Sequence, residues 1–156
     1  FKNIAQIFLV SFRKAPTLPI CKATPFAAVR EGIRAGYTSF HIYCGTGGRI
    51  DHTMANLQVL AYLSANNMRG FLFDNGTVIT AITNGSLCFG KILCGYVSVF
   101  SCSEKAEGVT LCGLKYELNH ATLTNTFPVG VSNEFIGRES RPRLSRNKCG
   151  NWYILP

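Results

Sequence analysis

An apolar segment, a glycine-rich loop and a helix-like segment follow one another in this chain, and their order constrains the fold more than any other feature. Residues 39–44 (SFHIYC) favour a buried strand, and residues 45–49 (GTGGR) form the loop. Residues 51–64 then carry an apolar stripe at helical spacing. The stripe consists of Met54, Leu57, Leu60, Ala61 and Leu63. We expect a strand, a glycine loop and a helix in direct succession.

The segments on either side extend this pattern. Residues 4–12 read as a strand, and Thr24-Pro25 is typical of a helix start, with Pro25 at the first helical position. Gly36 is a typical helix stop, and residues 69–73 read as a further strand. Alternating strands and helices predict a parallel sheet. We therefore expect residues 1–80 to form a partial α/β domain with a parallel sheet.

The second half of the chain has a different pattern of apolar and turn-forming residues. No helical period follows residue 64, and the turn signals Asn75-Gly76 and Asn84-Gly85 flank an alternating segment. In residues 96–101 the side chains alternate between two faces, as in a strand with one buried side. We expect residues 81–156 to form an antiparallel β-sandwich.

The net charge of +8 is unevenly distributed. Residues 1–44 hold six basic and one acidic residue, residues 45–137 hold five and six, and residues 138–156 hold five and one. The basic C-terminal segment is expected to be a solvated tail without the alternating strands that would complete a sandwich. A nucleic-acid binder would carry its basic residues on the folded face, so nucleic acid is not an expected partner.

Cysteine usage and hydropathy address the compartment. The seven cysteines are odd in number and lack C-x-x-C spacing. We therefore expect them to be reduced and mostly buried, and we expect the protein to be cytoplasmic. No apolar run reaches the roughly 20 residues that span a bilayer, so no membrane is expected as a partner. The chain begins at Phe1 rather than Met, which predicts a fragment.

The glycine loop is a candidate phosphate site. Glycines before a helix let the backbone approach an anion, and the helix N-terminus favours negative charge. Arg49 offers a planar fork for phosphate oxygens, and Asp51 a carboxylate for Mg²⁺. The alternative is that Thr46 or Asp51 only caps the helix and Arg49 is a surface residue. Neither a Walker A motif nor G-x-G-x-x-G spacing is present.

Three stretches, in order, resemble signature elements of the thiamine pyrophosphokinase family. Residues 47–60 (GGRIDHTMANLQVL) resemble G-G-R-x-D-H-x-x-A-N. Residues 108–123 (GVTLCGLKYELNHATL) resemble T-x-x-G-L-K-Y-x-L, and residues 129–135 (VGVSNEF) resemble G-x-S-N-E. The resemblance covers about residues 24–137. It implies that residues 1–80 are a partial α/β nucleotide-binding, catalytic domain and that residues 81–156 are a thiamine-binding β-sandwich. It also implies a homodimer whose active site lies between subunits.

The resemblance also implies an activity and a set of residues. The family transfers a diphosphate group from ATP to thiamine, giving thiamine diphosphate and AMP with the help of Mg²⁺. Carried onto this chain, the catalytic residues are Asp51 and Arg49, and Asp51 is also the metal ligand. The implied ATP contacts are Gly45, Thr46, Gly47, Gly48 and Arg49, and the implied thiamine contacts are Ser132, Asn133 and Asn56.

We expect structural or surface roles for several residues near these sites. Lys115 and Tyr116 are placed near the thiamine edge, with Lys115 structural rather than catalytic. We expect His52 to make a structural hydrogen bond, and Asp74 and Glu134 to be turn or surface acids.

The chain departs from the family at its acidic signatures. Ser11 and Arg13 stand where aspartates are expected, and Pro25 stands in place of another. These departures keep open an alternative, in which a truncated or catalytically impaired relative binds thiamine or a nucleotide without turnover.

Overall fold

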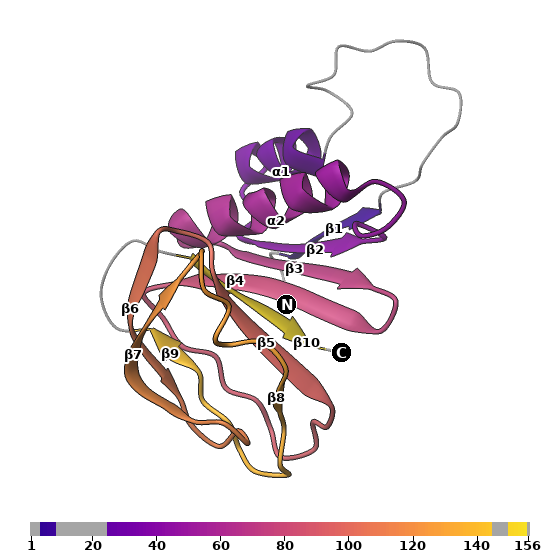
Figure 1. Ribbon diagram of the computed structural model, residues 1–156. Helices are drawn as coiled ribbons and strands as arrows, with labels where there is room; N and C mark the ends of the chain where they lie inside the picture. Colours follow the sequence, from indigo (N-terminus) through magenta and orange to yellow (C-terminus); the bar gives the residue numbers. More distant parts are fainter. Residues whose placement is uncertain (1–3, 9–24, 145–149, 156) are drawn as a thin grey trace.

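The computed structural model describes residues 4–8, 25–144 and 150–155 (Figure 1). Within these ranges the chain forms two helices, α1 (Pro25–Arg34) and α2 (Ile50–Ala65), and two sheets. The strands are β1 (Ile4–Phe8), β2 (Ser39–Tyr43), β3 (Arg69–Asp74), β4 (Thr77–Thr83), β5 (Tyr96–Ser101), β6 (Lys105–Leu111), β7 (Leu118–Thr124), β8 (Asn133–Glu134), β9 (Arg143–Leu144) and β10 (Gly150–Leu155).

The first half of the large sheet is parallel, as the alternation of strands and helices predicts. Strand β2 pairs in parallel with β1 on one side and β3 on the other. Both helices cover the same face of this region (Figure 1). The predicted helix start at Pro25 is confirmed, and Gly36 follows α1 with φ +86°, a conformation that suits glycine. Thr24 lies outside the described residues.

A hydrophobic core joins these helices to the sheet. Phe40, Ile42 and Leu72 point from β2 and β3 toward the helices and are fully buried. Leu60 and Leu63 of α2 pack in the same cluster. Burying side chains of this size stabilises the folded state by about 1.5–3 kcal/mol each, so this core fixes α2 against the sheet.

The predicted apolar stripe of α2 is partly wrong. The helix buries Asn56, Val59, Leu60, Leu63 and Ser64, at spacings of three and four residues. Met54 is 54% exposed because it lies two positions, about 200° around the helix, from Asn56. A polar residue, Asn56, therefore occupies an inward position where the sequence pattern suggested an apolar one.

The large sheet continues beyond its parallel half. A tight turn at Asn75-Gly76, with φ of +44° and +76°, joins β3 to antiparallel β4, as the turn signal predicts. The strand order is β1-β2-β3-β4-β10-β5-β8. One sheet thus runs through the predicted boundary at residues 80–81, which falls inside β4.

A second, three-stranded sheet has the order β7-β6-β9. Its inner face and that of β5 share a separate core, which contains Val97, Val99, Val109 and Leu111. Two helices and two sheets are therefore present. The antiparallel strands are divided between the two sheets rather than gathered in one separate unit. The alternation predicted for residues 96–101 is confirmed, with Val97 and Val99 buried.

The expectation of a strandless C-terminal tail is wrong. Strand β9 pairs with β6, and β10 lies between β4 and β5, antiparallel to both. The basic residues of this segment hid the strands because pairing depends on distant partners rather than on local alternation.

The cysteines also differ from expectation. Of the cysteines that the structure describes, Cys44, Cys88, Cys94 and Cys112 are exposed, while Cys102 is half-buried, so the expectation that they are mostly buried is wrong. Most lie at strand ends and turns, outside both cores. Cys21 and Cys149 fall outside the described residues. Over the part of the chain described, neither helix is long and apolar enough to cross a membrane.

Candidate functional site

The glycine loop starts where β2 separates from β3. The Cys44 N–H donates to the Phe73 carbonyl oxygen at 3.1 Å, and Cys44 then takes the left-handed conformation with φ +58°. A Cβ atom at Gly45 would lie 2.2 Å from Leu72 Cδ1, so a larger residue there would force the buried Leu72 side chain to move. The chain therefore leaves the sheet in close contact with the core.

Two side chains from outside the loop hold its first residues. Asn56 Nδ2, on the buried side of α2, donates to the Gly45 carbonyl oxygen at 2.7 Å. The Thr46 N–H donates to Asp74 Oδ2 at 2.7 Å, across the end of β3. We expected Asp74 to be a turn or surface acid; it lies at the turn but also binds the loop. Its position at the carboxyl end of a strand beside the loop strand was the available signal.

The second half of the loop leads into α2. Gly47 and Gly48 have φ of +109° and +68°, in the region that favours glycine. Thr53 Oγ1 accepts from the Gly47 N–H at 3.4 Å and lies 3.5 Å from the Arg49 carbonyl oxygen. Arg49 is the N-cap residue and makes no side-chain cap hydrogen bond. The capping alternative is therefore wrong for Thr46, whose N–H binds Asp74.

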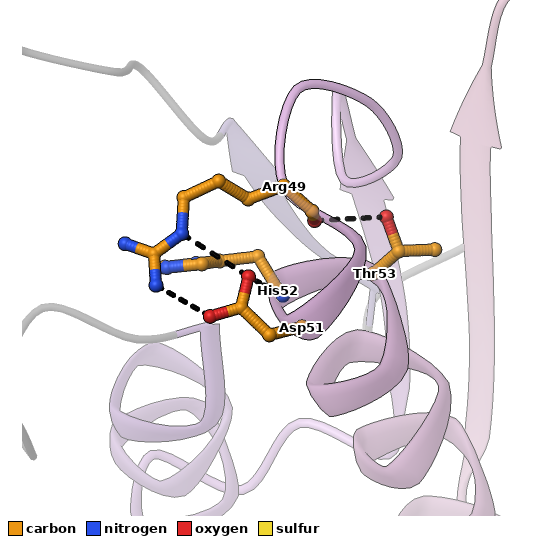
Figure 2. Close-up of polar contacts among 4 residues, drawn as sticks. All are labelled: Arg49, Asp51, His52 and Thr53. Carbon is orange, nitrogen blue, oxygen red and sulfur yellow. Dashed lines mark hydrogen bonds and ion pairs between the residues drawn. The ribbon is translucent and has the colours of Figure 1, made fainter.

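Arg49 and Asp51 face each other at the start of α2 (Figure 2). Arg49 Nε donates to Asp51 Oδ1 at 3.1 Å, and Arg49 Nη2 pairs with Asp51 Oδ2. Their side chains are 70% and 61% exposed. The hydrogen bond from Arg49 lowers the pKa of Asp51, and the same bond raises the pKa of Arg49. Both groups are therefore charged at neutral pH, and Arg49 is a surface residue.

The same carboxylate also touches the helix backbone. The His52 N–H donates to Asp51 Oδ1 at 3.0 Å (Figure 2), so the hydrogen bond expected of His52 is made by its backbone. An acid in the first turn is stabilised by the positive end of the helix dipole. Asp51 thus sits where a bound anion would also be stabilised.

Binding of Mg²⁺ at the glycine loop would depend on the side chains that can coordinate it there. Within the described residues, no three His, Cys, Asp or Glu side chains gather closely enough to hold a metal ion. Asp51 supplies one exposed carboxylate, and its oxygens currently face the Arg49 guanidinium. Mg²⁺ commonly uses one or two carboxylates together with substrate phosphates and waters, so Asp51 fits a metal that arrives with a nucleotide. Ser11 and Arg13 lie outside the described residues, and Pro25 begins α1.

The residues expected on the thiamine side gather around β8. Asn133 is only 3% exposed, and its side chain accepts from the Tyr116 and Glu134 N–H groups and donates to the Tyr116 carbonyl oxygen. Ser132 has φ +58°, is exposed, and donates its N–H to Ser98 Oγ at 3.0 Å. Asn133 therefore binds the backbone of the neighbouring turn, and Ser132 presents its hydroxyl at the surface.

Lys115 and Glu134 form an ion pair beside this turn. Lys115 Nζ lies 2.8 Å from both carboxylate oxygens of Glu134 and 5.6 Å from the centre of the Tyr116 ring. The hydrogen bond to Glu134 raises the pKa of Lys115. Lys115 and Tyr116 therefore both lie beside β8, and Glu134 is the ion-pair partner of Lys115.

The glycine loop and the β8 cluster lie far apart within one chain. Strand β8 is five positions from β2 in the sheet order, which corresponds to about 24 Å at the usual strand spacing. Figure 1 shows the β2–α2 connection at the helical end of the molecule and β8 at the other end. Asn56, expected with Ser132 and Asn133, lies instead at the glycine loop.

Comparisons with known proteins address the family. The family model for the thiamin pyrophosphokinase, vitamin B1 binding domain matches residues 88–142, which include the β8 cluster. A thiamine pyrophosphokinase of Bacillus subtilis (strain 168) is 34% identical over 92 residues, which are 58% of this chain and 43% of that protein.

Solved structures show the same similarity in three dimensions. The crystal structure of thiamine pyrophosphokinase from Bacillus subtilis has a TM-score of 0.74 at 26% identity, covering 82% of this chain and 60% of that chain. The enzyme from Geobacillus thermodenitrificans has a TM-score of 0.69 at 25% identity, covering 82% and 58%. The present chain spans less than half of the curated relative and about three fifths of these structures. Over the part that it spans, the chain is similar in sequence and fold to thiamine pyrophosphokinases.

Proposed function

We propose that two copies of this chain transfer a diphosphate group from ATP to thiamine, giving thiamine diphosphate and AMP. In this reaction the thiamine hydroxyl oxygen bonds to the β-phosphorus of ATP. The bond from that phosphorus to the α–β bridging oxygen breaks, AMP leaves with that oxygen, and the hydroxyl proton passes to water. The residues of the glycine loop would act on the nucleotide, and those near β8 on thiamine.

Each proposed role follows from the local chemistry. Gly45–Gly48 form the wall of the nucleotide site, and the Arg49 guanidinium binds phosphate oxygens. Asp51 holds Mg²⁺, which when bound neutralises charge on the triphosphate. Opening of the exposed Arg49–Asp51 pair costs little because such pairs are weak in water, so both groups are available to the substrate.

The thiamine side would be built on β8. Ser132 offers an exposed hydroxyl for a polar group of thiamine, and Asn133 shapes the turn that carries Tyr116. Asn56 is assigned to support of the glycine loop, since its amide donates to Gly45. This division retains the proposal that residues 1–80 serve the nucleotide and residues 81–156 serve thiamine.

The separation of the two groups is the observation that carries the proposal of a homodimer. Reacting atoms must approach to about 3–3.5 Å. Arg49 and Ser132 belong to regions about 24 Å apart along one sheet, so one copy does not bring both to the same substrate pair. Exposed apolar side chains near β8, including Tyr96, Tyr116 and Ile136, favour association with a second copy.

Turnover tests the activity directly. The purified chain is incubated with thiamine, ATP and Mg²⁺, and thiamine diphosphate and AMP are measured, with Asp51→Asn as the control. Product that the substitution abolishes supports the transfer reaction. Saturable thiamine or ATP binding without product supports the second candidate, a binding module, which is favoured because the described residues hold no cluster of three metal-binding side chains.

Complementation tests the shared site. Under the proposal Asp51→Asn is inactive and Ser132→Gly binds thiamine weakly, so both have little activity at a low thiamine concentration, and each carries one intact half. A random mixture of the two would regain about one quarter of wild-type activity, because half of the dimers contain one intact site. No recovery in a mixture shown to exchange subunits would contradict a site between copies.

A further inference from the structure

We propose that Asp74 is a positioning residue that sets the conformation of the glycine loop for the nucleotide phosphates, an inference that rests on the function proposed above. Asp74 Oδ2 accepts the Thr46 N–H at 2.7 Å, and the two residues are 28 positions apart in the chain. A carboxylate acceptor gives a shorter and stronger hydrogen bond than a neutral one.

Asp74 is well placed for this task because its own position is fixed. It is the last residue of β3 and pairs with Thr77 across the tight hairpin turn. The preceding residue, Phe73, accepts the Cys44 N–H. Two successive residues of β3 therefore bind the two ends of the segment Cys44–Thr46, so this part of the loop is anchored to the sheet.

The Thr46–Asp74 hydrogen bond lies directly before Gly47, Gly48 and Arg49, which form the rest of the proposed phosphate-binding loop. After Thr46 the chain passes through Gly47 and Gly48 to Arg49, whose side chain is largely exposed. The direction in which these residues leave Thr46 determines where their N–H groups and the guanidinium lie. A displacement of about 1 Å at a reacting site can cost 100-fold in rate, so an anchor at Thr46 matters for binding geometry.

The hydrogen bond between Thr46 and Asp74 is only half-buried, so its loss should disturb the hydrophobic cores less than the loss of a fully buried contact. Asp74 and Thr46 are both partly accessible, whereas Asn56 at the neighbouring Gly45 is 3% exposed. Water can replace the Asp74 carboxylate at the Thr46 N–H if the side chain is removed. We therefore expect loss of Asp74 to loosen the loop while the two cores stay intact.

The kinetic test compares two substitutions. Asp74→Asn keeps an oxygen acceptor and removes the charge, whereas Asp74→Ala removes both. In Asp74→Ala we expect the KM for ATP to rise at least about 10-fold with the KM for thiamine unchanged, and in Asp74→Asn to stay within about 3-fold of wild type. Glu31→Ala, which also removes one exposed carboxylate, should match wild type.

Three outcomes would overturn the inference. Equal ATP kinetics in Asp74→Ala and wild type would show that the bond does not position the loop. Equal losses in Asp74→Asn and Asp74→Ala, with a changed Mg²⁺ requirement, would make Asp74 a charged ligand instead. A parallel rise in both KM values would indicate general loss of structure.

Amide hydrogen exchange keeps this test independent of turnover. The Thr46 amide should be protected in wild type and Asp74→Asn, and should exchange at least about 10-fold faster in Asp74→Ala, while amides of β5 and β6 are unchanged. If the wild-type chain forms no thiamine diphosphate, the proposed function fails but the exchange result still decides whether Asp74 fixes the loop. Unchanged exchange at Thr46 in Asp74→Ala would refute the positioning role.

Discussion

Asn56 donates its side-chain amide to the carbonyl oxygen of Gly45 at 2.7 Å, inside the layer between α2 and the sheet. Asn56→Ala should lower the free energy of unfolding by about 1–3 kcal/mol, because the Gly45 carbonyl then lacks a partner in a buried position. Urea unfolding followed by circular dichroism measures the change.

Asn66 provides a matched control on the same helix. Its side-chain amide also donates to a backbone carbonyl, that of Tyr62, at 2.8 Å, but it is exposed. Asn66→Ala should cost less than Asn56→Ala, because water can satisfy the Tyr62 carbonyl. Equal losses in the two variants would show that burial of the Gly45 contact is not what stabilises the loop.

Gly45→Ala tests the close contact at the start of the loop. The added methyl would meet Leu72 Cδ1 at 2.2 Å, so we expect a loss of about 1–3 kcal/mol in the free energy of unfolding. Gly90→Ala is the control, since no atom lies within 4 Å of its Cβ position, and it should change stability by no more than about 0.5 kcal/mol. Thermal unfolding of both variants distinguishes a local clash from a general intolerance of alanine.

The Arg49–Asp51 pair predicts a pH effect confined to the site. Arg49 lowers the pKa of Asp51, so the pair's contribution is present above the ordinary carboxyl pKa and is lost as the pH falls through the lowered value. In Arg49→Ala the pKa of Asp51 should rise toward its ordinary value, which a carboxyl-carbon NMR titration measures. An unchanged Asp51 titration in this variant would show that the pair is not formed in solution.

The same substitution should separate binding from folding. Because both side chains are largely exposed, Arg49→Ala should leave the unfolding midpoint nearly unchanged. It should raise the dissociation constant for ATP by about 10-fold or more, since a charge-assisted phosphate contact is lost. Calorimetric titration with ATP decides the point, and unaltered affinity would remove Arg49 from the nucleotide site.

Adjacent residues at β8 should respond in opposite ways. Asn133→Ala removes three hydrogen bonds from a buried side chain and should lower the free energy of unfolding by about 1–3 kcal/mol. Ser132→Gly keeps the left-handed backbone without strain, so stability should hold or rise while thiamine affinity falls. Comparing urea unfolding with thiamine titration for the two variants tests this separation; a loss of stability in Ser132→Gly would contradict it.

The features of the fold that could be predicted are those encoded in short stretches of sequence. The strand at residues 39–44, the glycine loop and the following helix were visible because each has its own period or turn residues. The turn at Asn75-Gly76 was visible for the same reason. Met54 was wrongly predicted to face inward because it is apolar, whereas the buried face of the helix is fixed by contact with Leu72 and its neighbours.

In the candidate site, too, only contacts between residues close in sequence could be predicted. Arg49 and Asp51 are neighbours in sequence, and their proximity could be predicted. The contact of Asp74 with Thr46 spans 28 residues, and that of Ser132 with Ser98 spans 34, so neither leaves a local pattern. Such contacts depend on which strands become neighbours in the sheet, and single-sequence patterns do not specify that.

The place of β10 has a consequence for how the large sheet assembles. It separates β4 from β5, so the helix-covered strands and the strands next to β8 share a continuous hydrogen-bonded ladder only through residues 150–155. Contacts between segments so distant in the chain form slowly, because a long loop must close first. Until β10 inserts, β4 and β5 would each present an open edge, and such edges recruit other chains. During synthesis on the ribosome, this sheet would therefore be completed late, and its middle would be the part most exposed to aggregation.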